Sequence, residues 1–67
     1  MHLMVNGQEK ELAAGSTVAD LVADCGFRPG SVVVERNEEI VSGEAWRDVQ
    51  LATDDVIEIV QFMGGGC

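Results

Sequence analysis

The sequence predicts an α+β fold in which one helix covers one face of a small mixed sheet of four to five strands. Two observations lead to this fold class. Segments with alternating or β-branched apolar residues lie at both ends of the chain, and a single segment with helical spacing lies between them. The length of 67 residues allows one domain with one small core.

The N-terminal segment is predicted to form a β-hairpin. In Met1–Val5, alternation places Leu3 and Val5 on one face of a strand. Asn6-Gly7 follows, and both residues tolerate the positive φ of a type I′ turn. Gln8–Leu12 then returns as a mostly polar strand, which is typical of the edge of a sheet.

The next segment is predicted to be a short helix that begins after Thr17. Thr17 is a favourable N-cap residue, and Asp20 places a carboxylate in the first turn. Gly26 is expected to end the helix, and Pro29-Gly30 prevents its continuation. The apolar stripe that packs on the sheet is expected to consist of Val18, Leu21, Val22 and Cys25.

Three further strands are predicted in the second half of the chain. Val32–Glu35 and Ile40–Val41 are separated by a turn at Asn37, and Ser42–Val49 suits an irregular loop or one helical turn. Val56–Phe62 is the most hydrophobic strand, so we expect it to be central and parallel to the first strand. This arrangement is a β-grasp fold.

The net charge restricts the classes of partner. Twelve Asp and Glu against four Lys and Arg give a charge of −8. Nucleic acid and anionic membrane surfaces are disfavoured, because both attract cationic proteins. We expect a protein partner with a basic docking face.

The sequence also indicates a cytoplasmic protein in a reducing compartment. No apolar run approaches the roughly 20 residues that span a bilayer, and Met1–Asn6 lacks the features of a signal peptide. The two cysteines, Cys25 and Cys67, are too few for a disulfide framework and match no zinc spacing.

The C-terminal sequence Met63–Cys67 contains three consecutive glycines directly after a predicted strand. Glycine has the largest conformational entropy, so one interpretation is a frayed terminus. The other is a flexible arm that enters a narrow slot in another protein and carries a terminal carboxylate. The preceding β-grasp pattern favours the second interpretation. We therefore divide the chain into a domain, 1–62, and a flexible tail, 63–67.

Short segments spread over nearly the whole chain form an ordered set that closes on Gly-Gly: Asn6-Gly7, Ala14–Leu21, Val34–Asn37, Ile40-Val41, Trp46, Asp54–Val60 and Phe62–Gly66. This set resembles the ThiS family, the ubiquitin-like sulfur carrier proteins of thiamin (thiazole) biosynthesis. No single segment is specific, and the resemblance depends on the set as a whole.

The resemblance implies a carrier that binds no cofactor and has no enzymatic activity of its own. In that family an E1-like enzyme uses ATP and Mg to adenylate the carboxylate of the terminal glycine. A persulfide derived from cysteine, through a cysteine desulfurase, then replaces AMP and leaves a thiocarboxylate. Thiazole synthase uses this sulfur for the thiazole ring. On this sequence the implied sulfur-carrying terminus is Gly65-Gly66.

Cys67 departs from the family pattern, which ends on the glycine that corresponds to Gly66. The Gly66 carboxyl group is tied up in a peptide bond to Cys67, and an amide cannot be adenylated. We expect a peptidase to remove Cys67. A rival interpretation makes the Cys67 thiol a persulfide carrier, but the glycines already explain the tail.

The last predicted strand also indicates a docking patch. If Ile57 and Ile59 face the helix, the alternate residues lie on the open face, which is normally polar. Apolar residues there, beside the predicted reactive terminus, indicate a contact surface for partners. The predicted docking residues are Val60, Phe62, Met63, Gly64 and Met4.

Other conspicuous residues are assigned structural roles. Cys25 is expected in the core, His2 is expected to be solvated, and Trp46 is expected to cover one end of the core. The Asp and Glu residues are spread along the chain, so we expect a solvated acidic surface with no catalytic pair and no metal site.

Three alternatives remain open from the sequence. The first is a related sulfur carrier, such as the carrier subunit of molybdopterin synthase. The second is a ubiquitin-like modifier that forms isopeptide bonds to lysine. The third is an interaction module whose tail has no chemical role.

Overall fold

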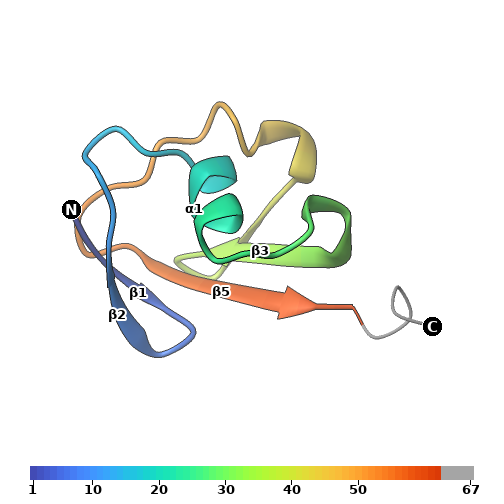
Figure 1. Cartoon of the computed structure of the whole chain (residues 1–67), viewed down its shortest axis with the longest axis horizontal. Coiled ribbons are helices and arrows are strands. Elements are labelled where there is room, and N and C mark those ends of the chain that lie inside the picture. The colour runs from blue at the N-terminus through green and yellow to red at the C-terminus, as the bar shows by residue number, and fades with distance from the viewer. Residues whose placement is uncertain (63–67) are drawn as a thin grey trace.

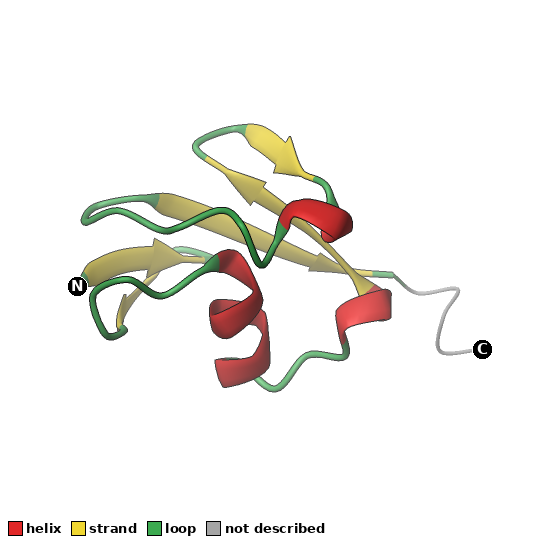
Figure 2. Cartoon of the chain, turned by 90° about the horizontal axis from the view of Figure 1, so that it is seen from above, coloured by secondary structure: helices red, strands yellow, loops and turns green. Residues whose placement is uncertain are grey.

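The computed structural model describes residues 1–62, and residues 63–67 lie outside the described part. Five strands form one mixed sheet in the order β2-β1-β5-β3-β4, and helix α1 packs on one face of it (Figures 1 and 2). The predicted α+β, β-grasp architecture is confirmed. The elements are β1 (His2–Val5), β2 (Gln8–Glu11), α1 (Val18–Asp24), β3 (Val32–Arg36), β4 (Glu39–Val41), β5 (Val56–Gln61) and the 3-10 turns Pro29–Ser31 and Gly43–Ala45.

The β1–β2 hairpin forms where the sequence predicts it. Asn6 and Gly7 have φ values of 51° and 81°, as a type I′ turn requires. Strand β2 lies at the edge of the sheet. Both strands are one residue shorter than expected, because β1 begins at His2 and β2 ends at Glu11. There the N-terminal amine of Met1 donates to the carbonyl oxygen of Leu12 over 2.8 Å, which closes the hairpin.

Helix α1 begins with a capping box. The Asp20 N–H donates to Thr17 Oγ1 over 3.2 Å, and the Thr17 N–H donates to Asp20 Oδ2 over 2.9 Å. Gly26 follows the helix with a φ of 83°, which a residue with a side chain rarely adopts. Lys10 Nζ lies 2.6 Å from Asp24 Oδ2 and joins β2 to the last turn of the helix.

Strand β5 is the centre of the sheet, as predicted. It pairs in parallel with β1, where Val5 lies opposite Ile57, and antiparallel with β3, where Val34 lies opposite Ile59. Its alternation is also as predicted, because Ile57 and Ile59 are buried beneath the helix and the residues between them are exposed. Figure 1 shows β5 running toward the end of the molecule away from Met1.

A single hydrophobic core lies between α1 and the inner face of the sheet. Trp46 belongs to this core, and its indole Nε1 donates to the carbonyl oxygen of Val41 over 2.9 Å, so its polar atom is satisfied. The fully buried side chains are those of Leu3, Leu21, Ile57, Val18, Val22 and Val34.

The structure differs from two expectations about single side chains, those for Cys25 and Asp55. Cys25 is only half-buried and packs against the core from its margin, because it is the C-cap residue of a short helix. The expectation for His2 holds, because its side chain is accessible to solvent, and its ring nitrogens lie 3.3 Å from oxygens of Glu9 and Asp54. Asp55 is buried, with 6% of its surface exposed, although the acidic residues were all expected to be solvated.

Candidate functional site

The end of β5 is the structural element that leads into the glycine sequence. The Phe62 N–H donates to the carbonyl oxygen of Ser31 over 2.8 Å and ties this end of the chain to the turn before β3. The predicted roles of Met63, Gly64, Gly65–Gly66 and Cys67 fall on residues outside the described part, so they stay predictions.

Two of the predicted docking residues lie on the open face of the sheet at this end. Val60 and Phe62 are 53% and 48% exposed. Val60 lies opposite Val33 of β3, which adds a third apolar side chain to the same face. The predicted exposure of this apolar pair is confirmed.

Met4 is half-buried and lies elsewhere on the same face. Its register partner is Val56, at the start of β5, whereas Val60 and Phe62 lie toward the end of that strand. The structure therefore brings Met4 together with Val56 and not with the apolar residues at the end of the strand.

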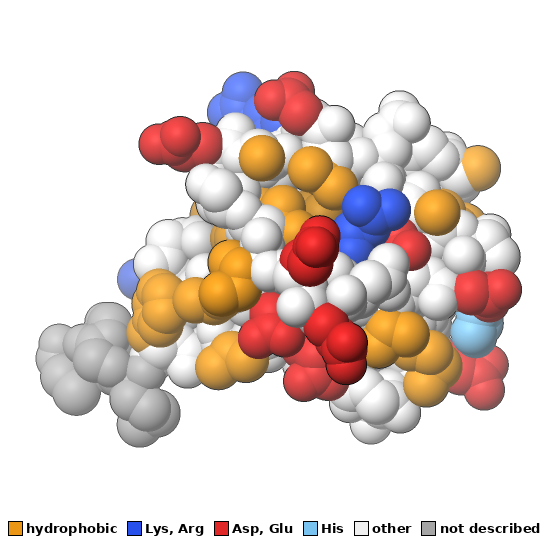
Figure 3. Space-filling model, turned by 180° about the vertical axis from the view of Figure 1, so that it is seen from behind, with side chains coloured by type: hydrophobic (Ala, Val, Ile, Leu, Met, Phe, Trp, Pro, Cys, Tyr) orange, Lys and Arg blue, Asp and Glu red, His pale blue; other side chains and the backbone are white. Residues whose placement is uncertain are grey.

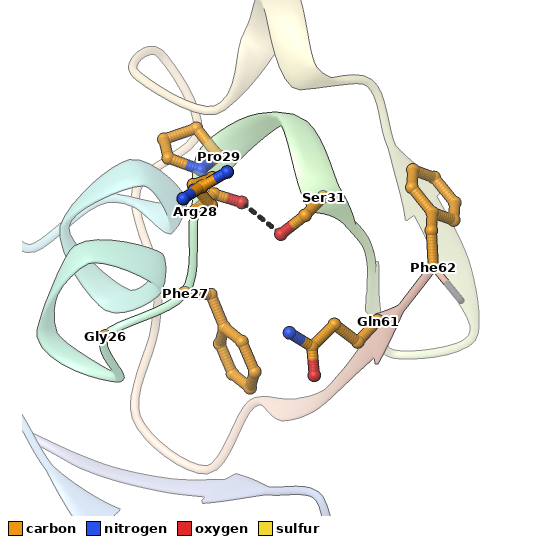
Figure 4. Close-up of a pocket in the computed structure, with 7 residues that line it drawn as sticks. All are labelled: Gly26, Phe27, Arg28, Pro29, Ser31, Gln61 and Phe62. Carbon is orange, nitrogen blue, oxygen red and sulfur yellow. Dashed lines mark hydrogen bonds between the residues drawn. The ribbon is translucent and has the colours of Figure 1, made fainter. Parts of the chain in front are cut away.

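A groove lies beside the end of β5 (Figure 4). It has a volume of about 560 Å³ and separates the α1–β3 connection from Gln61 and Phe62. Phe27 and Gln61 point toward one another across it, and Phe62 points away from Phe27. Ser31 Oγ donates to the carbonyl oxygen of Arg28 over 2.8 Å and stabilises the wall of the groove.

Sequence reasoning missed this groove. The sequence between α1 and β3 predicts only the end of a helix, and nothing in the local pattern shows that Phe27 faces Gln61. The available signal was an aromatic and a basic residue, Phe27-Arg28, directly after the helix-ending Gly26. Such a pair in a loop is a common feature of contact surfaces.

Asn6 holds β5 in position from the neighbouring hairpin. Its Oδ1 accepts the Ile59 N–H over 2.7 Å, and its Nδ2 donates to the Ile59 carbonyl oxygen over 3.3 Å. The side chain thus continues the hydrogen bonding of β1 to β5 beyond the last paired residue. The sequence indicated Asn6 only as a turn residue, because this contact spans 53 positions.

A buried polar cluster supports the opposite end of β5. Asp55 Oδ2 accepts from Arg36 Nε and from the Ala52 N–H, each over 2.8 Å, and Oδ1 accepts from Asn37 Nδ2 over 3.0 Å. Burial raises the pKa of the Asp55 carboxyl group. These three hydrogen bonds outweigh that effect and hold the pKa below its usual range. Asn37 Oδ1 accepts the Val56 N–H, which links the cluster to the start of the strand.

His2 has a raised pKa. The hydrogen bond to Asp54 is the largest cause, desolvation opposes it, and Glu9 adds a second hydrogen bond and a favourable charge interaction. Within residues 1–62, no group of three or more His, Cys, Asp or Glu side chains is placed to hold a metal ion. The helices of the described chain include none with the length and apolar character needed to cross a membrane.

The fold and the sequence at the end of β5 define a class of protein. The chain is a small ubiquitin-like β-grasp domain whose central strand leads directly into a glycine-rich C-terminal sequence. The model of the ThiS family matches residues 3–66, and the chain belongs to that family.

Relatives and a solved structure agree with this assignment. The sulfur carrier protein ThiS of Bacillus subtilis is 42% identical over 65 residues, which cover 96% of this chain and 98% of that protein. The sulfur carrier protein ThiS of Escherichia coli is 30% identical over 66 residues. The crystal structure of a thiamine biosynthesis protein (ThiS) from Geobacter metallireducens superimposes with a TM-score of 0.83 at 32% identity, covering 98% of this chain and all of the other.

Two further relatives are much longer proteins. A thiazole synthase of Magnetococcus marinus is 42% identical over 66 residues, and one of Paramagnetospirillum magneticum is 41% identical over the same length. In both cases the match covers 98% of this chain but only 20% of the synthase. The chain therefore spans about a fifth of the length of these relatives.

Proposed function

We propose that this protein is a sulfur carrier in thiamin biosynthesis and that the carboxylate of Gly66 is its carrier group. An E1-like enzyme joins this carboxylate to AMP, with ATP as the donor, Mg as the enzyme's cation and pyrophosphate as the leaving group. A persulfide supplied through a cysteine desulfurase then attacks the acyl carbon and displaces AMP. Reductive cleavage of the S–S bond by a thiol leaves a thiocarboxylate for thiazole synthase.

The anchored end of β5 is the observation that carries this proposal. The hydrogen bond of Phe62 to Ser31 fixes the point from which the glycine sequence starts. Four extended residues reach at most about 14 Å, so the reacting groups of each partner must lie within that distance of Phe62. Glycine has no side chain, and a slot that admits only backbone would accept this sequence.

Catalysis belongs to the partners in this proposal. A carboxylate is a poor acyl donor until adenylation gives it a good leaving group, and no step needs a side chain of the carrier. The carrier therefore supplies only the terminal acid and a surface for docking. Val60 and Phe62 are the proposed contacts on the described surface, together with Met4. Met63 and Gly64 are proposed to continue the contact into the partner's slot.

Thiazole synthase is the proposed acceptor of the sulfur. Two proteins named thiazole synthase contain a segment that matches nearly all of this chain. A carrier and its acceptor enzyme within one polypeptide have a high effective concentration for each other. This relationship supports the proposal that the free-standing chain meets a thiazole synthase as a partner.

Cys67 must be removed for this chemistry, because the Gly66 carboxyl group is otherwise an amide. We assign that cleavage to a peptidase. The test uses two chains, one that ends at Gly66 and one that ends at Cys67, each incubated with the activating enzyme, ATP and Mg. We expect an adenylate by mass spectrometry only on the first. A chain that ends at Gly65 is the matched control for terminus length.

Two results would overturn the proposal. The first is equal adenylation of the chains that end at Gly66 and at Cys67. The second is the absence of an adenylate on the Gly66 terminus when the same enzyme adenylates its own cognate carrier. If the adenylate forms on the Gly66 terminus as expected, addition of the persulfide donor should convert it to a product in which sulfur replaces one oxygen of the terminal carboxyl group.

A further inference from the structure

The outer sheet face, which consists of the strand side chains that point away from α1, carries two like charges side by side. Glu35 of β3 lies directly opposite Glu58 of β5 in the antiparallel register. Glu58 lies between the buried residues Ile57 and Ile59, and Glu35 follows buried Val34, so both carboxylates are on the outer face. Side chains paired in this way have Cβ atoms about 5 Å apart.

No cation of the described chain forms a salt bridge with this pair. Neither Glu35 nor Glu58 takes part in a salt bridge among residues 1–62. Lys10 is paired with Asp24 instead, and Arg36 Nε is bonded to buried Asp55. Like charges directly opposite one another destabilise a sheet. The isolated domain therefore keeps an unfavourable charge pair in the middle of its open face.

Apolar side chains flank the two carboxylates on the outer sheet face. Ile40, 71% exposed, lies opposite Glu35 on β4, and Val60 and Val33 form the next cross-strand pair toward the end of β5. In Figure 3 hydrophobic side chains gather toward the end of the molecule where the described chain stops, and acidic side chains occupy the lower middle of that view. At the centre of a protein interface, apolar contacts beside a charged residue exclude water from it when the partner binds.

We propose that the outer sheet face docks on the activating enzyme through one arginine or lysine of that enzyme, which inserts between Glu35 and Glu58. This inference rests on the proposed function. A guanidinium group presents several N–H donors in one plane and can bond two carboxylates at once. Ile40, Val33 and Val60 then pack on apolar residues of the enzyme and dehydrate the charged contact.

Charge complementarity selects this occupant over a second copy of the chain. A two-fold dimer through this face would place one acidic pair against another. Each copy would also bring a net charge of −8. A basic enzyme surface relieves the repulsion that the free domain carries. The face continues to Phe62, so an enzyme bound there also receives the terminus.

The test measures binding of the full chain to the activating enzyme by calorimetry without ATP, so that it requires neither cleavage of Cys67 nor adenylation. The variants are E35Q and E58Q, which keep side-chain size and remove one charge. E44Q is the matched control, because Glu44 is an exposed residue of the Gly43–Ala45 turn away from the outer sheet face and the change in net charge is the same.

We expect the dissociation constant to rise about tenfold for E35Q and for E58Q, with a weaker dependence on salt, and to change less than about twofold for E44Q. Thermal unfolding of E35Q and E58Q should occur at the same or a higher temperature than for the wild type, because a repulsive pair is removed. Binding of E35Q and E58Q equal to that of E44Q would overturn the inference, as would sedimentation of the free chain as a dimer that V60D, a charge placed on the same face, dissociates. If the wild type binds but is never adenylated at Gly66, the proposed function fails while the docking result stands.

Discussion

The substitution D55N tests the buried cluster that supports the start of β5. Asp55 accepts three hydrogen bonds, from Arg36, Asn37 and Ala52, and only 6% of its surface is exposed. An amide keeps the shape but replaces one acceptor oxygen with a donor, which leaves at least one buried donor without a partner and removes the charge that pairs with Arg36. An unsatisfied buried donor costs about 1–3 kcal/mol. Arg36 is partly exposed, so the lost ion pair adds only about 1 kcal/mol.

We therefore expect D55N to lower the free energy of unfolding by about 2–4 kcal/mol. A domain of this size has a total stability of roughly 3–10 kcal/mol, so the loss is a large fraction of it. Urea unfolding followed by the fluorescence of the buried Trp46 measures the change. D48N is the matched control, because Asp48 is exposed, takes part in no ion pair among residues 1–62 and gives the same charge change. A difference between the two variants below about 0.5 kcal/mol would refute the structural role of Asp55.

The same carboxyl group predicts a dependence of stability on acid. Its pKa is lower in the folded state than in the unfolded chain, so its contribution is present above the unfolded pKa and is lost as the pH falls through the folded pKa. The wild type should therefore lose stability more steeply than D55N as the pH falls below about 4. Parallel curves for the two proteins would contradict this assignment.

Three further substitutions test other parts of the structure. N6G keeps the positive φ of the turn but removes both hydrogen bonds to Ile59, and it should lower the free energy of unfolding by about 1–2 kcal/mol in urea titrations. An unchanged midpoint would show that the Asn6 side chain does not hold β5 in position. F62D should leave the far-ultraviolet circular dichroism spectrum unchanged and weaken binding to the activating enzyme, whereas loss of the spectrum would mean that Phe62 belongs to the core. His2 has a raised pKa, so its contribution is complete below the usual value of 6.5 and is lost as the pH rises through the folded-state pKa. The melting temperature of the wild type should therefore decline as the pH rises through the folded-state pKa of His2. H2Q should not show this decline. If the decline persists in H2Q, another titrating group causes it.

The sheet and the helix could be predicted because their signals are local. Asn6-Gly7 determines the hairpin, Thr17 with Asp20 determines the start of the helix, and the apolar alternation of β5 determines which face is buried. Each of these signals acts within a few residues. They are also mutually consistent, which is why the central position of β5 and its parallel pairing with β1 could be predicted.

The features that could not be predicted depend on contacts between distant segments. Burial of Asp55 requires Arg36 and Asn37 to lie beside it, and both come from another hairpin. The groove forms because the segment after α1, with Phe27, lies beside the end of β5, with Gln61, and these segments are far apart in the sequence. The charge pair on the outer face depends on the exact register of β3 on β5, which a shift of one residue would abolish.

The most direct test of the carrier role is the mass of the protein isolated from its native cells during thiamin limitation. We predict a chain that ends at Gly66, with one oxygen of its terminal carboxyl group replaced by sulfur and the position of the sulfur established by fragmentation. A population made entirely of chains that retain Cys67 in cells with active thiazole synthesis would contradict that role. Sulfur bound to a cysteine side chain instead of the terminal carboxyl group would contradict it equally.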